Sequence, residues 1–295
     1  RAESSKTAQE PGESSPSLRG RRVGAIFLGV RGRLTYEVDM RRRSLLLTGI
    51  AWGIARTALA APVPVLHRDF VLVLDAGHGG SNHGCSSDHF KVEEKHVTLQ
   101  LAKAVAAQVR RKVPGIRVML TRTRDEDVPL SERIAVANEV RADLFVSVHA
   151  NASPKRDQSG YETFVLDLES SKREVARTAR RAQRDRNTPL STDGDAELML
   201  RELQLRANFK KATRVASAIQ QSMRRAFPSR QDRGVRQGAF DVLRGLDMPG
   251  VLTEVGFLDH AGEGPWLVEP ETIESIATSI CDGVMLFYKE HAHLG

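Results

Sequence analysis

Cysteine is scarce in this chain, and long apolar stretches are missing. Its 295 residues include two cysteines, Cys85 and Cys281, which are too few for a framework of disulfides. They could form one bridge in an oxidising compartment, but the sequence does not show whether they meet. No segment approaches the roughly 20 apolar residues that a membrane span requires, and no internal repeat is visible. We therefore expect neither a disulfide-stapled domain nor stable insertion into a membrane.

The first 60 residues differ in composition from the rest. Residues 1–39 are polar and rich in Ser and Arg, which predicts a disordered, non-native extension upstream of a true start at Met40. Residues 40–60 combine a basic stretch, an apolar stretch and a small-x-small site, the pattern of a secretory signal peptide. The run that begins at Arg41 also resembles a twin-arginine export signal. The alternative is one apolar helix behind a polar tail. We expect an exported, periplasmic protein with a linker at 61–68.

Positive charge is concentrated in that first segment. The chain carries 44 Lys and Arg against 37 Asp and Glu, for a formal net charge of +7. Residues 1–60 hold 11 of the basic and 5 of the acidic residues, so the remainder is close to +1. A nucleic-acid-binding function, which a basic chain would suggest, therefore loses its support from charge.

Apolar runs and helical periodicity alternate along the remaining residues. Residues 70–74 and 144–149 are continuous apolar runs typical of strands buried on both faces. Further strands are predicted at 116–120, 161–166 and 251–255, and helices at 94–113, 131–140, 196–227 and 273–287. This alternation predicts an α/β fold, a single domain in which a mixed, mostly parallel β-sheet is flanked by helices on both faces.

The segment at about 168–205 stands apart because arginine is crowded into 169–187 and an acidic patch follows. One interpretation is a solvated surface helix and loop. The other is a mobile insert beside the active site, since long inserts in compact domains often act as lids.

Polar residues follow three of the predicted strands. His78 lies in a glycine-rich turn after the first strand, and His149 and Glu254 end two others. Because ligands gather at the carboxyl ends of strands in open α/β sheets, we expect these side chains to meet. Two imidazoles and a carboxylate, with a position left for water, form a common catalytic zinc set. Glu94, at the start of a helix, is a further carboxylate for it.

Each of these residues also has a structural interpretation. A histidine after a strand can be an ordinary core residue, and Glu94 could complement a helix dipole. Glu254 is harder to explain that way, because a charge in an apolar strand is costly unless it is paired or bound to a metal. Asp75 could orient an imidazole or cap the turn. Rival ligands remain on spacing alone: His83, His89, His96 and Glu93.

Four short motifs carry a family resemblance. They are DAGHGG at 75–80, Glu-Lys at 94–95, SVHAN at 147–151 and LTEVG at 252–256. Together they resemble the zinc-dependent N-acetylmuramoyl-L-alanine amidases of bacterial cell walls (the Amidase_3 type), over about residues 69–291. The resemblance implies that His78, Glu94 and His149 bind one zinc ion and that Glu254 is the catalytic carboxylate. It favours Glu94 over Glu93, because the family's ligand directly precedes a lysine.

The resemblance also implies a substrate and a form of regulation. The expected reaction is hydrolysis of the peptidoglycan amide between N-acetylmuramic acid and L-alanine, in wall remodelling or daughter-cell separation. In exported members an inserted helix can plug the zinc site until an activator protein removes it; the insert here could act so through Glu197 or Glu202. The chain departs from the family at 81–85, which lack a frequent acidic residue, and at Thr98, where Asn is frequent. Alternatives are a zinc peptidase of stem-peptide bonds and a non-catalytic wall-binding regulator.

Overall fold

The computed structural model describes residues 69–87, 91–169, 171–173, 176–177 and 192–292. The chain divides into two units, Arg1–Ala61 and Pro62–Gly295, and the described residues all belong to the second. The predicted upstream extension, signal peptide and linker, and His89, lie outside the described residues. Among the helices of the described part, none has both the length and the apolar character needed to cross a membrane.

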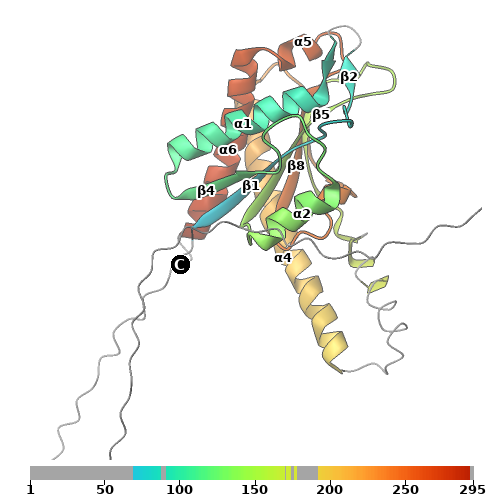
Figure 1. Cartoon of the computed structure of the whole chain (residues 1–295), viewed down its shortest axis with the longest axis vertical. Coiled ribbons are helices and arrows are strands. Elements are labelled where there is room, and N and C mark those ends of the chain that lie inside the picture. Colours follow the sequence, from blue (N-terminus) through green and yellow to red (C-terminus); the bar gives the residue numbers. More distant parts are fainter. Residues whose placement is uncertain (1–68, 88–90, 170, 174–175, 178–191, 293–295) are drawn as a thin grey trace, which may run out of the picture. The chain divides into compact units, whose positions relative to one another are not determined.

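Six strands form one sheet in the order β4-β1-β5-β8-β6-β7 (Figure 1). In chain order they are β1 Phe70–Ala76, β4 Ile116–Leu120, β5 Leu144–Asn151, β6 Tyr161–Leu166, β7 Asp232–Gly238 and β8 Gly250–Phe257. β6 is antiparallel to β8, and every other neighbouring pair is parallel. The prediction of a mixed, mostly parallel sheet in one α/β domain is confirmed. A small antiparallel pair, β2 Ser86–Ser87 and β3 Val92–Glu93, was not expected from the sequence.

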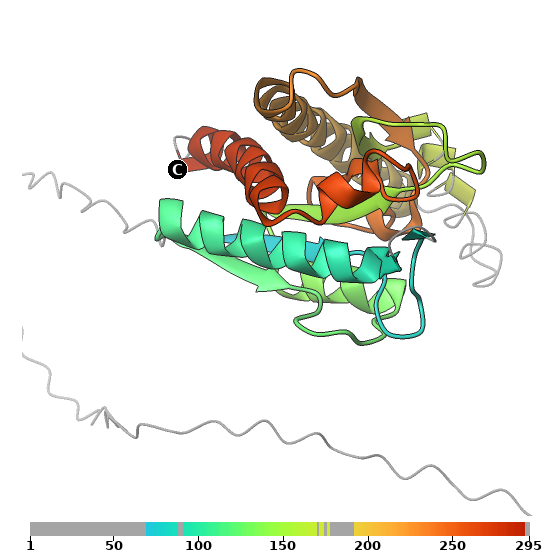
Figure 2. The same cartoon turned by 90° about the horizontal axis from the view of Figure 1, so that it is seen from above.

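Helices cover both faces of the sheet, as predicted. Three long helices, α1 Glu94–Lys112, α4 Thr192–Ala226 and α6 Pro270–Ala292, pack on one face, and Figure 2 shows α6 between α1 and α4. The other face carries α2 Leu130–Glu139 and the short 3-10 helix η1 Asp241–Leu243. A short helix, α5 Gly264–Leu267, follows β8.

Alternate side chains of each strand are buried on opposite faces of the sheet, because successive side chains of a strand point to opposite faces. In β5, Val146 and Val148 join the larger apolar cluster under α1 and α6, whereas Phe145 joins the smaller one under α2. The smaller cluster includes Val73 and Leu252, and the next residues of β1 and β8 on that face are polar. The carboxyl-end part of the α2 face is therefore lined with polar side chains.

The direction of β6 decides where its neighbouring segments lie. β1, β5 and β8 are parallel, so their carboxyl ends share one edge of the sheet. β6 is antiparallel to β8, with Glu162 opposite Glu254 and Val165 opposite Val251. β6 therefore starts at that edge and ends at the opposite one, where the segment 168–205 begins.

Candidate metal centre

His78 lies in a tight turn directly after β1. Its φ is +61°, and φ is +127° at Gly79 and +58° at Gly80, in a left-handed region that costs a side-chain-bearing residue free energy. The turn is tied down from outside, because Gly80 N–H donates to Asp125 at 2.7 Å and Arg133 donates to the His78 carbonyl at 2.7 Å. These contacts hold the imidazole at the sheet edge.

Asp75 supports this turn through Arg133. The Arg133 guanidinium donates to Asp75 Oδ1 at 2.7 Å, and both side chains are buried. Asp75 also accepts hydrogen bonds from Ser147 at 2.6 Å and Thr121 at 2.7 Å. Within the described part of the chain, the contacts of Asp75 include no imidazole. Asp75 therefore supports the turn through Arg133, and among the described residues it makes no direct hydrogen bond that would cap the turn.

Three predicted residues meet at this edge. Glu94 Oε1 lies 3.1 Å from His78 Nε2 and 2.9 Å from His149 Nδ1. One ligand atom from each of the three side chains lies within 4.8 Å of the others. Glu94 is held by two backbone donors, since Cys85 N–H reaches Oε2 at 2.9 Å and Ala150 N–H reaches Oε1 at 3.1 Å. We call His78, Glu94 and His149 the metal cluster.

Neighbouring groups set the orientation of both imidazoles. Asn82 Oδ1 lies 2.8 Å from His78 Nδ1, and His78 Nε2 faces Glu94. The His149 ring lies against Gly77, where an added Cβ would come within 2.3–2.7 Å of three ring atoms. The glycine after β1 thus provides the space that the His149 ring occupies.

The charges within the metal cluster shift two pKa values. Burial opposes ionisation of Glu94, but hydrogen bonds from His149 and His78 outweigh it and hold the pKa of Glu94 well below its usual range. Burial also opposes protonation of His149, yet the hydrogen bond to Glu94 and the nearby Glu254 raise the pKa of His149 to about 9.

Glu254 lies beside the metal cluster on β8. It is paired with His149 in the register of β5 and β8, and only 9% of the residue is exposed. Its Oε2 has no hydrogen-bond partner among the described residues. Burial is the main cause that raises the pKa of Glu254 to about 7. The charge of His149 acts to lower this pKa, and the charges of Glu94 and Glu162 act to raise it. A carboxyl group with this pKa can exchange a proton at neutral pH.

The donor set of the metal cluster fits a zinc ion. Zinc binds imidazole nitrogen at about 2.0–2.1 Å and carboxylate oxygen at about 2.0–2.2 Å, commonly with three protein ligands in catalytic sites. The present nitrogen-to-oxygen separations of 2.9 and 3.1 Å bring the donors close enough to share one ion. Asn82 also supplies the outer hydrogen bond that ligating histidines typically make.

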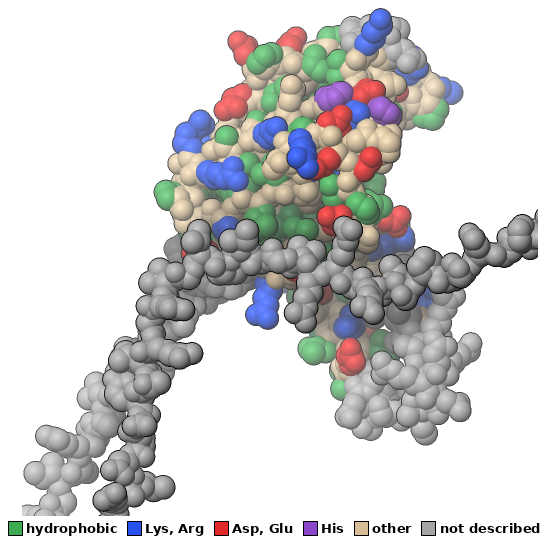
Figure 3. Space-filling model, viewed as in Figure 1, with side chains coloured by type: hydrophobic (Ala, Val, Ile, Leu, Met, Phe, Trp, Pro, Cys, Tyr) green, Lys and Arg blue, Asp and Glu red, His purple; other side chains and the backbone are tan. Residues whose placement is uncertain are grey.

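The three rival ligands that the structure describes, His83, His96 and Glu93, do not join the metal cluster. His83 and Glu93 pair with each other at 2.8 Å; His83 is exposed and Glu93 is partly exposed. His96 lies 3.8 Å from Glu93 and from Asp125. Figure 3 shows exposed histidine, acidic and basic side chains gathered near the amino end of α1. This surface group lies outside the metal cluster.

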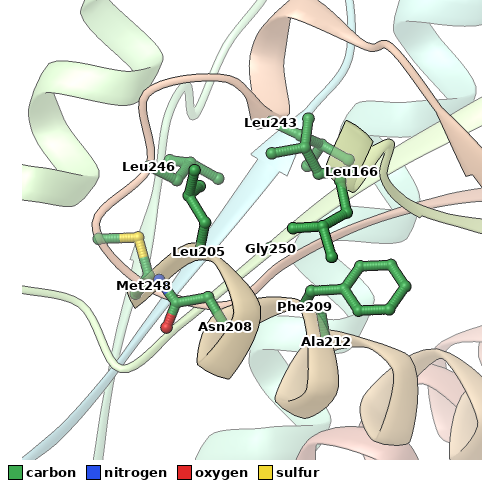
Figure 4. Close-up of a pocket in the computed structure, with 10 residues that line it drawn as sticks. Leu166, Leu205, Asn208, Phe209, Ala212, Leu243, Leu246, Met248 and Gly250 are labelled. Atoms are coloured by element: carbon green, nitrogen blue, oxygen red, sulfur yellow. The ribbon is translucent and has the colours of Figure 1, made fainter. Parts of the chain in front are cut away.

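The structure does not bring Glu197 or Glu202 to the metal cluster. Both lie on the first turns of α4, which in Figure 1 extends away from the sheet, and they pair with Arg201 at 3.4 Å and Arg206 at 2.8 Å. The next turns of α4 pack beside the amino end of β8, where Leu205, Phe209 and Gly250 help to line an apolar pocket (Figure 4). The expectation that either carboxylate plugs the site is not met in this conformation.

Several supporting residues were not identified from the sequence. Asn82, Arg133 and Arg122 hold the turn, and Arg122 donates to the carbonyls of Ala76 and Gly77 at 2.9 and 2.8 Å. Thr98, which stands where the family often has Asn, donates to the Gly77 carbonyl at 2.7 Å. Asn82 was within reach of local reasoning, because it follows His78 by four residues in a glycine-rich turn.

Comparisons with known proteins agree with this geometry. Residues 72–285 match the family profile of N-acetylmuramoyl-L-alanine amidases, Amidase_3. Among named relatives, the amidase AmiC of Escherichia coli O6:H1 is 29% identical over 235 residues, which cover 77% of this chain and 55% of AmiC. The amidase AmiA of E. coli K12 is 31% identical over 223 residues, covering 74% of this chain and 76% of AmiA. The chain thus spans about half the length of AmiC.

Solved structures share the fold. An N-acetylmuramoyl-L-alanine amidase from Clostridium difficile 630 superposes with a TM-score of 0.58 at 26% identity, covering 75% of this chain and 97% of that structure. The catalytic domain of the amidase CwlV from Bacillus (Paenibacillus) polymyxa gives 0.53 at 28% identity, covering 75% and 98%. The described part of this chain therefore corresponds to nearly the whole of these two structures.

Proposed function

Because the chain belongs to the Amidase_3 family of N-acetylmuramoyl-L-alanine amidases, we propose that it hydrolyses the peptidoglycan amide between N-acetylmuramic acid and L-alanine. The observation that carries this proposal is the metal cluster, with a buried carboxylate beside it on β8. Cleavage of this bond separates the glycan strand from the stem peptide, a reaction of wall remodelling or daughter-cell separation.

The residues of the site would have two separate roles, metal binding and proton transfer. His78, Glu94 and His149 would hold one zinc ion, which when bound supplies Lewis acidity and lowers the pKa of a water towards about 7. Glu254 takes a proton from the attacking water and returns it to the nitrogen of the departing L-alanine. Burial raises the pKa of Glu254 above its ordinary value, which favours a carboxyl group that can both accept and release a proton.

The decisive test is digestion of purified peptidoglycan by residues 61–295 with zinc. Mass spectrometry should detect free stem peptides that begin with L-alanine, and Glu254→Gln should abolish their release while the protein stays folded. Cleavage inside the stem peptide would instead support a zinc peptidase. Equal release by Glu254→Gln would refute the role assigned to Glu254.

We further propose that the protein is exported and that a partner acts on the segment 168–205. Export is supported by the sequence pattern of residues 40–60. The partner is supported by three exposed apolar side chains on neighbouring turns of α4, Met199, Leu200 and Leu203. A folded variant without residues 168–205 should differ from the whole protein in basal wall-lytic activity. Unchanged activity would exclude inhibition by this segment.

A further inference from the structure

A row of polar side chains on the α2 face starts at His149 of the metal cluster and crosses the sheet towards β7. His149 of β5 is in register with Glu254 of β8, which is opposite Glu162 of β6. Paired residues of neighbouring strands point to the same face. Arg236 of β7 continues this row, because it is paired with Phe164 of β6, two residues from Glu162 on the same face.

The row ends in two arginines that share one carboxylate. Glu162 Oε2 lies 2.8 Å from Arg236 Nε and 3.2 Å from Arg233 Nε. The other oxygen, Oε1, accepts a hydrogen bond from Asn151 at 2.9 Å. Glu162 is buried, with 3% of its side chain exposed, and its Oε2 meets the two arginines as ion pairs without a hydrogen bond among the described residues. Two cations thus face one anion, which leaves a surplus positive charge at this position.

Much of the donor capacity of Arg236 is left over. Its described contacts, to Glu162 and to the Arg233 carbonyl at 3.4 Å, both use Nε. A guanidinium has five N–H donors, and the fork formed by its terminal nitrogens matches a carboxylate. About half of the Arg236 side chain is exposed. Arg233 is mostly buried and lies over the Phe257 ring, 5.0 Å from its centroid, which fixes this second cation in place.

We propose that Arg233 and Arg236 form a subsite that binds a carboxylate of the stem peptide during hydrolysis. The proposal rests on the proposed function, because it names how that substrate is oriented. β7 lies two strand spacings from β8, or about 10 Å, which equals about three residues of extended peptide. The lactyl carboxyl of the glycan is consumed in the scissile amide, whereas the peptide keeps its own carboxylates. An anion-binding subsite at this distance therefore places the stem peptide along the polar row, from the metal cluster towards β7. The glycan then lies on the opposite side of the metal cluster.

The test compares two small substrates. One is a muramoyl-L-alanyl peptide with free carboxylates, and the other is the same compound with its carboxylates amidated. Arg236→Gln should raise KM for the free acid about tenfold, the loss expected for one charge-assisted contact, and leave the amidated compound nearly unchanged. Arg236→Lys should recover part of the difference. The matched control is Arg214→Gln, since Arg214 pairs with Glu290 at 3.3 Å on the helical side.

Each outcome decides something different. An equal loss on both substrates, in kcat and KM alike, would mean that Arg236 only supports Glu162, and it would overturn the subsite. If the wild-type protein cleaves neither compound, the proposed function fails. The subsite would then be decided by calorimetry with the free-acid and amidated peptides alone. Tighter binding of the free acid that is lost in Arg236→Gln supports the subsite, and equal binding overturns it.

Discussion

On the side of the His78 ring away from Glu94, Asn82 Oδ1 lies 2.8 Å from Nδ1 and helps to fix the orientation of the imidazole. Asn82→Ala removes the acceptor, so the imidazole can rotate or carry its hydrogen on the nitrogen that faces Glu94. We expect zinc affinity to fall about 10- to 100-fold, the usual effect of losing such an outer partner. Competition with a chromophoric chelator measures this change. Asn82→Asp keeps an acceptor and should retain the affinity; equal losses in both variants would contradict the role of the hydrogen bond.

Glu254 should make the metal-free protein less stable as the pH rises. Its folded pKa of about 7 lies above the ordinary value of 4.5, so the folded state binds more protons than the unfolded state between these values. The contribution of the protonated Glu254 carboxyl to the free energy of unfolding is fully present below pH 4.5. It is lost as the pH rises to about 7. The shift corresponds to ~3 kcal/mol at most.

Denaturant unfolding with a zinc chelator present, at pH 5 and pH 8, measures this effect. Glu254→Gln cannot ionise, so its free energy of unfolding should fall less between the two pH values than that of the wild type. Glu162→Gln is a useful comparison, because it removes one of the carboxylates that raise the pKa of Glu254. The same pH dependence in wild type and Glu254→Gln would show that Glu254 is not the titrating group.

The sequence was sufficient to identify the site residues at the ends of strands. It was not sufficient to identify the residues whose hydrogen bonds hold those site residues in position. His78, His149 and Glu254 were expected together because parallel strands deliver their ends to one edge, and the structure places them there. Arg133 was not foreseen, because its contact with the His78 carbonyl joins residues 55 positions apart. No local pattern marks an arginine on a short amphipathic helix as one that reaches a turn in another element.

At the scale of elements, the turn after β1 is shaped for the His149 ring. A Cβ on Gly77 would lie 2.3 Å from one ring atom of His149. Gly77→Ala should therefore displace His149 and lower zinc affinity by at least tenfold, measured by chelator competition. Gly115→Ala is the matched control, since its Cβ would meet only Tyr288 at 3.5 Å, an ordinary contact. Unchanged affinity in Gly77→Ala would show that the ring has room to move.

The direction of one strand explains why the segment 168–205 does not bring Glu197 or Glu202 to the metal cluster. The strand at 161–166 was predicted correctly, but its pattern of residues does not reveal its direction. Because β6 is antiparallel to β8, the segment after it leaves from the edge opposite the metal cluster. α4 then continues as 35 residues, longer than the sheet it covers, so its first turns, including Glu197, extend past it. Strand direction is set by long-range pairing, which a single sequence read locally does not contain.

At the scale of the whole molecule, the alternation of strands and helices was sufficient to predict the α/β class and the layers. The buried apolar runs of β1, β5 and β8 have no other stable arrangement than a sheet covered on both faces. The strand order, which sets β5 and β8 side by side, was not predicted. That adjacency pairs His149 with Glu254, so the site depends on topology as well as on residue type.

The metal cluster connects elements that are distant in the chain, so zinc should stabilise the whole domain. Its ligands come from the turn after β1, the start of α1 and the end of β5. An ion that binds only the folded state adds about 2.7 kcal/mol at a free concentration of 100 times Kd. For a domain of this size, that corresponds to a rise in Tm of about 5–10 °C. Calorimetry of residues 61–295 with zinc and with chelator measures the rise in Tm.

His149→Ala should abolish this rise in Tm. His83→Ala should keep it, because His83 pairs with Glu93 outside the metal cluster. A rise retained in His149→Ala would place the ion elsewhere.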